Sequence, residues 1–227
     1  DATVREIRTA ITYCKNMMLG ADEIRAQHFD VPGFFTIYTR YCQALRAARQ
    51  MDYDDQMTYA LAILRKHPDV LAQFQTQYPH LCVDESQDTS RVQHAIIRLL
   101  AEKAGNLFLV GDEDQSIYGF RGAYPAALLD FQSNYNEPCI LRMETNYRSD
   151  RNIVSAANQF IKLNTRRLDK NMRAQSQKDG AIVVTCIDRM EQQAELLLER
   201  IRNQKPDESL AILYRNNDSA IPLINLL

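Results

Sequence analysis

The chain has 227 residues, of which 45% are hydrophobic and 25% are charged, an ordinary composition for a globular protein. Its formal net charge is −2, so any binding of nucleic acid has to rely on local features. No apolar stretch approaches the roughly 18 residues of a membrane-spanning helix, and the N-terminus shows no secretory signal. The five cysteines and four histidines show no spacing typical of metal ligands.

The first third of the chain predicts helices. Apolar residues recur at helical spacing in three segments, residues 4–11, 34–48 and 54–66. Pro32 and Gly33 separate the first two segments, and Pro68 is expected to stop the third. No strand pattern appears before about residue 80, so the sequence predicts an N-terminal all-helical subdomain.

The pattern changes near residue 80. Residues 81–83 and 107–110 are short apolar runs, and each ends directly in acidic residues or in Gly-Asp. A helix is expected between them, because Ser90 or Thr89 can cap it and Gly105 can close it. Strand, helix and strand with short connections predict a parallel βαβ unit. Polar residues at the carboxyl ends of such strands lie where open α/β sheets bind ligands.

A second β/α series begins near residue 136. The expected elements, in chain order, are a strand over residues 139–143, a helix over 150–164 with Ser149 as its N-cap, a strand over 181–187, a helix over 190–202 and a strand over 210–214. Residues 162–173 form a basic stretch opposed by Asp169 alone. We interpret this stretch as a solvated loop, with contact to phosphates as the alternative.

Acidic side chains follow the first predicted strand directly, in the run VDESQD at residues 83–88. Mg²⁺ prefers carboxylate oxygens, and phosphoryl transfer to water needs a group that orients or deprotonates the nucleophile. Asp84 and Glu85 can divide these two tasks. The alternative is that Asp84 and Asp88 merely cap the following helix, as acids near helix N-termini often do.

The second strand end is the most informative run, GDEDQSIYGFRGA at residues 111–123. Its glycines permit sharp turns and close backbone approach. Gln115 is a neutral group that can hydrogen-bond a phosphate or an attacking water. Tyr118, Phe120 and Arg121 combine aromatic faces with a cation, which suits the unstacked bases of a single strand. The alternative is that the aromatic residues belong to the core and that the arginine is a solvated charge.

Four runs, VDESQD, GDEDQSIYGFRGA, METNYRS and AILYRNN, follow one another in the order seen in superfamily-one DNA helicases of the UvrD/PcrA/Rep type. They resemble motifs II, III and IV of that family and the segment before its large inserted domain. The resemblance spans most of the chain. It implies an α/β fold made of RecA-like P-loop NTPase core pieces, with a parallel sheet and flanking helices.

The resemblance also implies three domains. Residues 1–77 would form a helical accessory subdomain and a helix that returns into the first core domain. Residues 78–135 would be part of the first RecA-like domain, and residues 136–227 part of the second.

The resemblance assigns roles at the ATP site. Asp84 would hold Mg²⁺, usually through water, with Glu85 beside it as the general base toward the hydrolytic water. Gln115 would sense the γ-phosphate and Tyr147 would stack on the adenine. Arg148 would reach the γ-phosphate from the second core domain as an arginine finger, a role that needs a planar and permanently charged cation.

The resemblance further implies a single-stranded DNA track lined by Tyr118, Phe120 and Arg121, with Asn217 at a further contact position. The cofactors would be ATP and Mg²⁺. The partners would be single-stranded DNA and the remainder of the helicase chain, and no membrane association is expected. Movement would run from 3′ to 5′, in the cytoplasm and in association with the nucleoid.

Two features depart from the family pattern. Phe120 stands where many members have tryptophan, and phenylalanine also appears there in helicase-nuclease subunits. No GxxxxGK[ST] phosphate-binding loop occurs in the sequence. We therefore expect a fragment of a longer helicase that has little ATPase activity in isolation. The alternatives are a fragment of a helicase-nuclease subunit and a non-catalytic module that binds single-stranded DNA.

Overall fold

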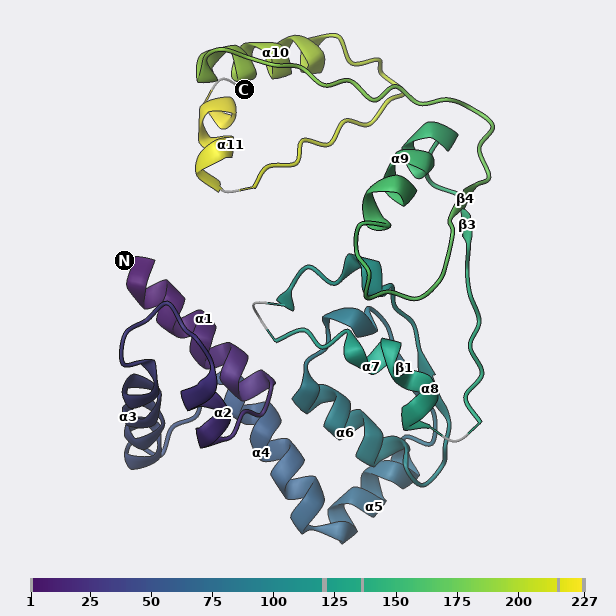
Figure 1. Ribbon diagram of the computed structural model, residues 1–227. Helices are drawn as coiled ribbons and strands as arrows, with labels where there is room; N and C mark the ends of the chain where they lie inside the picture. The colour runs from purple at the N-terminus through teal and green to yellow at the C-terminus, as the bar shows by residue number, and fades with distance from the viewer. Residues whose placement is uncertain (1, 120–121, 136, 216, 226–227) are drawn as a thin grey trace.

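A computed structural model describes residues 2–119, 122–135, 137–215 and 217–225 (Figure 1). Its N-terminal part contains the helices α1 Ala2–Asn16, α2 Ala21–Ala26, α3 Phe34–Ala47, α4 Tyr53–Lys66 and α5 Pro68–Gln77. The three predicted helical segments are confirmed by α1, α3 and α4. Pro68 does end α4, but it also starts α5, which the sequence reading missed. Proline suits the first turn of a helix, because the N–H group that it lacks has no helical partner there.

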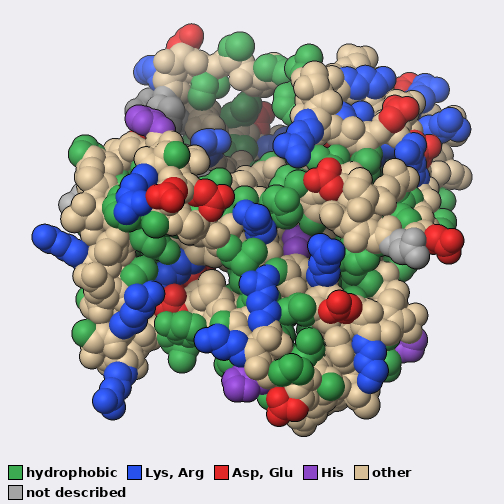
Figure 2. Space-filling model, turned by 60° about the horizontal axis from the view of Figure 1, so that its bottom comes forward, with side chains coloured by type: hydrophobic (Ala, Val, Ile, Leu, Met, Phe, Trp, Pro, Cys, Tyr) green, Lys and Arg blue, Asp and Glu red, His purple; other side chains and the backbone are tan. Residues whose placement is uncertain are grey.

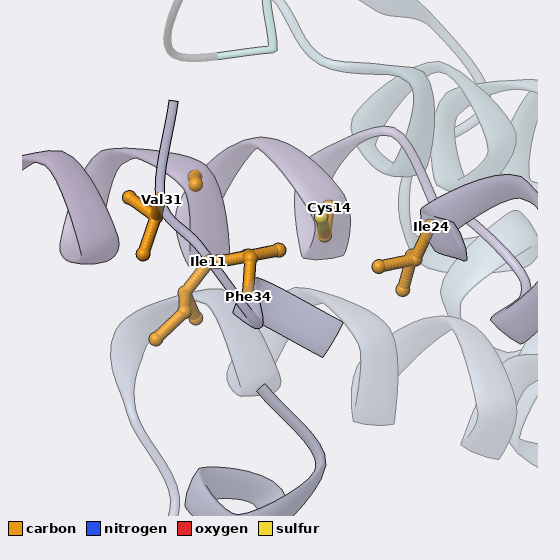
Figure 3. Packing of buried hydrophobic residues seen from close by; sticks show 6 residues of the cluster. Ile11, Cys14, Ile24, Val31 and Phe34 are labelled. Carbon is orange, nitrogen blue, oxygen red and sulfur yellow. The ribbon is translucent and has the colours of Figure 1, made fainter. Parts of the chain in front are cut away.

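The helical part has its own small core (Figure 3). Ile11 and Cys14 of α1 pack with Ile24 of α2, with Val31 in the loop before α3 and with Phe34, the first residue of α3. Burial raises the pKa of the Cys14 thiol to about 11, so this cysteine stays protonated and behaves as a small apolar side chain.

A buried ion-pair cluster joins α1 to α4. The Lys15 side chain is only 4% exposed, and its Nζ lies 2.6 Å from Asp52 Oδ2 and 2.7 Å from Asp55 Oδ1. The Tyr41 hydroxyl donates to the same Asp52 oxygen at 2.8 Å, and Asp52 also caps α4 by accepting from the Asp55 N–H. Burial acts to lower the pKa of Lys15, but the hydrogen bonds to the two aspartates outweigh it and raise the pKa. Lys15 is therefore a charged link between two helices.

The predicted βαβ unit is confirmed. Strand β1 Leu81–Val83 pairs in parallel with β2 Leu107–Leu109, and α6 Arg91–Ala101 connects them. Ser90 is the N-cap of α6 and shares a capping box with Gln93. Gly105 adopts a left-handed φ of 66° and donates its N–H to the Ala101 carbonyl, which closes the helix as expected. Helix α4 packs against both α1 and α6, so it fastens the helical part to this unit.

The chain then continues through short elements. These are the 3-10 turns η1 Ser86–Asp88 and η2 Glu113–Gln115, the helices α7 Ala126–Leu129, α8 Phe131–Asn134, α9 Arg151–Ile161, α10 Met190–Arg202 and α11 Asn217–Ile224, and the strands β3 Thr145–Asn146 and β4 Arg173–Ala174. Strands β3 and β4 pair in parallel beside α9, and α10 packs against α11 (Figure 1).

Three predicted strands are wrong. Among the described residues, segments 139–143, 181–187 and 210–214 contain no strand, and the extended segments that reach α10 and α11 stand apart in Figure 1. Val184 is 85% exposed and Leu213 is 95% exposed. A strand needs hydrogen bonds from a neighbouring strand, and an apolar run does not supply that neighbour. Helix α9 is also shorter than predicted, with Asp150 rather than Ser149 at its N-cap.

The surface carries both signs of charge. On the face drawn in Figure 2, lysine and arginine side chains predominate, with aspartate and glutamate side chains among them. No helix in the described part of the chain is long and apolar enough to cross a membrane.

The Lys15 cluster generates the first prediction. Lys15→Met should lower the free energy of unfolding by about 3 kcal/mol, because it leaves Asp52 and Asp55 without their buried cation. Urea unfolding measures the change, with Lys66→Met on the exposed end of α4 as the matched control. Equal stability of the two variants would contradict the role given to this cluster.

Candidate functional site

The two acidic loops meet at one edge of the β1–β2 pair. The Val110 N–H donates to the Val83 carbonyl at 2.8 Å, and the Ser86 N–H donates to the Val110 carbonyl at 2.9 Å. The loops that follow the strands therefore start side by side. This is the arrangement expected from parallel strands, whose carboxyl ends share one edge.

Asp84 and Glu85 project from the end of β1 into solvent. Glu85 has a left-handed backbone with φ of 48°, which is uncommon for a residue other than glycine. Its N–H donates to Asp84 Oδ1 at 2.8 Å. The sharp turn keeps both carboxylates exposed while the next two residues, Ser86 and Gln87, are buried. The carboxylate oxygens are suitable donors for a hard divalent cation.

Gln87 links the two loops, and the sequence reading did not single it out. Its buried side chain donates from Nε2 to Glu85 Oε2 at 2.7 Å and accepts at Oε1 from the Asp112 N–H at 3.0 Å. The Ser116 hydroxyl donates to the Gln87 backbone carbonyl at 3.2 Å. A glutamine can make this bridge because its amide both donates and accepts. Gln87 thus fixes Glu85 relative to the second loop.

Gln115 lies at the end of η2, exposed to solvent. Its Nε2 donates to Asp112 Oδ2 at 2.8 Å. Asp112 is the N-cap of the same turn and accepts from the Asp114 N–H at 3.1 Å. The structure therefore brings Asp84, Glu85 and Gln115 to the same edge. Gln115 is hydrogen-bonded to Asp112, and the Asp112 N–H is in turn hydrogen-bonded to Gln87.

The acidic run 112–114 pairs with cations from the basic stretch. The Arg167 guanidinium makes a bidentate contact with Asp114, at 3.0 Å from Nε to Oδ1 and 2.7 Å from Nη2 to Oδ2. Lys170 Nζ lies 3.0 Å from Glu113 Oε2 and also contacts Asp112. The interpretation of residues 162–173 as a solvated loop is therefore wrong for these two cations, because nearby acids compensate their burial.

This pairing also bears on metal binding. Among the described residues, Asp112, Glu113 and Asp114 bring carboxylate oxygens close enough together to hold a metal ion. Lys170 contacts all three of these carboxylates, and Arg167 contacts Asp114. Because the Lys170 and Arg167 side chains already occupy this cluster, the exposed pair Asp84 and Glu85 is the better candidate for a divalent ion.

Tyr147 and Arg148 follow β3 and belong to a different part of the molecule. Tyr147 is 76% exposed, and the Arg148 side chain is exposed as well. Asn146 Oδ1 accepts from the backbone N–H groups of Arg148 and Ser149 and so fixes the turn. Among the described residues, no hydrogen bond or ion pair joins Arg148 to Asp84, Glu85 or Gln115. These two candidates are thus not brought into contact with the acidic strand ends.

The DNA candidates are partly described. Tyr118 is 40% exposed, and Asn217 is an exposed residue at the start of α11. Phe120 and Arg121 lie outside the described residues. The chain after them returns to the start of α6, where the Tyr124 N–H donates to the Thr89 carbonyl at 2.9 Å. The described residues on either side of them, Ser116 and Tyr124, thus contact Gln87 and Thr89.

Comparison with known families is decisive. The UvrD/REP helicase N-terminal domain matches residues 2–136, and the UvrD-like helicase C-terminal domain matches residues 141–227. The chain belongs to the UvrD/REP helicase family. The family resemblance inferred from the four ordered motifs is thereby confirmed.

Curated members of the UvrD/REP family show the same likeness. The chain is 36% identical over 186 residues to "ATP-dependent DNA helicase PcrA" of Leuconostoc citreum, which covers 80% of this chain and 25% of that protein. PcrA of Staphylococcus aureus strain Mu50 is also 36% identical over 186 residues, covering 80% and 26%. PcrA of Staphylococcus epidermidis is 34% identical over 214 residues, covering 92% and 29%. The chain spans about a quarter of the length of these relatives.

Close packing at the strand ends generates the second prediction. A Cβ atom on Gly111 would lie 2.8 Å from Gln87 Oε1 and 2.8 Å from Leu128 Cδ1. Gly111→Ala should therefore lower the free energy of unfolding by about 1–3 kcal/mol through overpacking. Gly119→Ala is the matched control, since a Cβ there meets nothing within 4 Å. Urea unfolding in which both variants match the parent chain would refute this close approach.

Proposed function

We propose that this chain is part of an ATP-dependent DNA helicase and translocase that moves from 3′ to 5′ on single-stranded DNA. The carrying observation is the meeting of Asp84, Glu85 and Gln115 at one edge of a parallel strand pair. Family membership supports the proposal, as do the relatives, which are named ATP-dependent DNA helicases. Acting on chromosomal DNA, such a protein would work at the nucleoid in the cytoplasm.

In this proposal the exposed acidic pair serves hydrolysis. Asp84 holds Mg²⁺, which when bound with ATP offsets the negative charge of the phosphates. Glu85 takes a proton from the attacking water, and the hydrogen bond from Gln87 orients its carboxylate for that step. Gln115 binds the γ-phosphate and reports its presence to the adjoining loop. The hydrogen bond from Gln115 to Asp112 has to exchange for the phosphate when nucleotide binds.

The proposal divides the α/β part into pieces of two RecA-like domains, residues 78–135 and 136–227, preceded by the helical part at 1–77. Tyr147 stacks on the adenine, and Arg148 contacts the γ-phosphate when the two pieces close around ATP. The exposure of both side chains leaves them available for this contact. A guanidinium suits the task because it stays charged and binds phosphate oxygens in pairs.

Tyr118, Phe120, Arg121 and Asn217 form the proposed DNA track. Aromatic faces stack on unpaired bases without regard to sequence, and arginine adds attraction to the backbone. The first three of these residues directly follow the turn that ends in Gln115. A change at the phosphate sensor therefore needs to travel only a few residues to reach the DNA.

Hydrolysis generates the third prediction. The full-length protein that carries this segment should hydrolyse ATP faster when single-stranded DNA is added, and Glu85→Gln should lower that rate by about 100-fold or more. The isolated chain should show negligible turnover, because it contains no GxxxxGK[ST] loop to cradle phosphates. Phosphate release measures both rates.

Two outcomes would overturn the hydrolysis proposal. One is rapid turnover by the isolated chain that depends on Glu85. The other is a full-length protein that binds single-stranded DNA but hydrolyses no ATP, which would favour the non-catalytic binding module. A nuclease domain encoded in the same gene would instead assign the chain to a helicase-nuclease subunit.

DNA binding generates the fourth prediction. The chain should bind a fluorescent single-stranded oligonucleotide at low salt, and the affinity should fall as salt rises, because counterions are released on binding. Phe120→Ala combined with Arg121→Ala should weaken binding by about tenfold, given that stacking on one base contributes about 1–3 kcal/mol.

The matched control is Phe74→Ala combined with Arg65→Ala, which removes an exposed aromatic and an exposed arginine from the helical part. Fluorescence anisotropy compares the two double variants. An equal loss of affinity in both would contradict a DNA track at residues 118–121.

A further inference from the structure

Five charged residues far apart in the sequence form one cluster, which we call the charge clamp. The clamp consists of Asp112, Glu113, Asp114, Arg167 and Lys170. The acids lie between β2 and Gln115, and the cations lie between α9 and β4. The clamp thus joins the Gln115 loop to the segment between α9 and β4, and β4 pairs with β3 directly before Tyr147 and Arg148.

The clamp is shielded from solvent except at Asp112, whose side chain is 37% exposed. The exposed fraction of the side chain is 3% for Glu113, 11% for Arg167 and 15% for Lys170. Burial acts to raise the pKa of Asp114, but hydrogen bonds from Arg167 and Lys170 outweigh it and lower the pKa. Burial acts to lower the pKa of Lys170, but hydrogen bonds to Asp112 and Glu113 outweigh it and raise the pKa. Both groups therefore stay charged near neutral pH.

The cations are directed at the acids and not at an external ligand. Arg167 directs its Nε and Nη2 to Asp114, and its Nη1 and Nη2 also approach the Lys170 carbonyl. The backbone N–H of Leu168 donates to Glu113 Oε1 at 2.9 Å, which adds a neutral contact to the ion pairs. A phosphate of DNA would have to displace these buried partners, so the basic stretch is not a phosphate site at these two residues.

The clamp is connected to both groups proposed for hydrolysis. Asp112 contacts Lys170 through Oδ1 and accepts from Gln115 Nε2 through Oδ2. The Asp112 N–H donates to Gln87, whose side chain donates to Glu85. A displacement of Lys170 is therefore transmitted to Gln115 through Asp112, and to Glu85 through Asp112 and Gln87. Different atoms of Asp112 make these contacts at the same time, so together they give the loop a defined position.

We propose that Arg167 and Lys170 are positioning residues, which hold the Gln115 loop in its working geometry and tie it to the segment that bears Arg148. This rests on the proposed function, since the loop positioned here is the one assigned to ATP sensing. Neither cation needs to touch nucleotide or DNA. Each acts through the carboxylates of residues 112–114. A buried ion-pair cluster is suited to this role, because such clusters favour one specific geometry more than they raise stability.

The first measurement follows the loop itself. In the 227-residue chain, Arg167→Asp should raise amide hydrogen exchange at residues 114–116 by about tenfold or more, because the loop loses its anchor and opens locally. The variant Arg167→Lys should keep exchange within about threefold of the parent chain, since it retains a cation beside Asp114 and leaves no buried carboxylate unpaired. Arg151→Asp is the matched control, because it breaks the exposed ion pair with Asp179.

The second measurement uses the full-length protein. Arg167→Asp should lower the ratio of DNA-stimulated to DNA-free ATP turnover by about tenfold, with the KM for ATP changed less than about threefold, and Arg167→Lys should keep the ratio within about threefold of the parent protein. A purely structural role would lower both turnover rates together and leave their ratio unchanged.

Unchanged loop exchange in a folded Arg167→Asp variant would overturn the proposal. So would an unchanged stimulation ratio in a variant whose loop exchange has risen. A parent protein without ATP turnover would refute the proposed function, while the exchange measurement would still decide whether the clamp holds the loop.

Discussion

The parallel pairing of β1 with β2 is the constraint on which the rest of the candidate site depends. Three residues of each strand align, Leu81 to Val83 with Leu107 to Leu109. The two following loops must then leave the pair at the same edge. Without this register, Asp84 and Glu85 would have no fixed relation to Gln115. The Gln87 bridge is possible only because the Asp112 N–H comes within 3.0 Å of its side-chain oxygen.

In two places in this molecule, a buried lysine between carboxylates connects two segments of the chain. Lys15 joins α1 to α4 by contacting Asp52 and Asp55, and Lys170 joins the basic stretch to residues 112–114. In both places burial would disfavour the charge, and adjacent acids more than offset that effect. Such a pair favours one packing arrangement, since an alternative packing would leave a charge buried and unpaired. The Lys15 cluster connects α1 to α4 within the helical part, and the charge clamp connects the basic stretch to the Gln115 loop.

Among the described residues, the ion pairs between the second half of the chain and the first are those of the charge clamp. Strands β3 and β4 contribute two residues each, and extended segments lead to α10 and α11 (Figure 1). The charge clamp is therefore prominent among the links that the described residues make between the two halves. In a protein proposed to work by closing two domains around ATP, the position of that link matters. It lies directly before Gln115, the residue proposed to sense the γ-phosphate.

The sequence by itself determined the family, the early helices and the βαβ unit. Helical periodicity is local, and the capping residue Ser90 and the terminating Gly105 act within a few positions of the helix that they bound. The four runs VDESQD, GDEDQSIYGFRGA, METNYRS and AILYRNN identified the family because they resemble its motifs and follow one another in its order. Their positions directly after predicted strands make Asp84, Glu85 and Gln115 candidates from the sequence alone.

Only the tertiary structure decided which residues meet across the chain. The bridge made by Gln87 and the pairing of Arg167 with Asp114 join residues separated by 25 and 53 positions, and no local pattern encodes such a contact. For the same reason the strands expected at 139–143, 181–187 and 210–214 did not follow from their apolar runs. A strand forms only where a neighbouring strand supplies hydrogen bonds, and a charge is buried only where an opposite charge pairs with it. Both the neighbouring strand and the ion-pair partner come from distant parts of the sequence, so only the folded chain determines them.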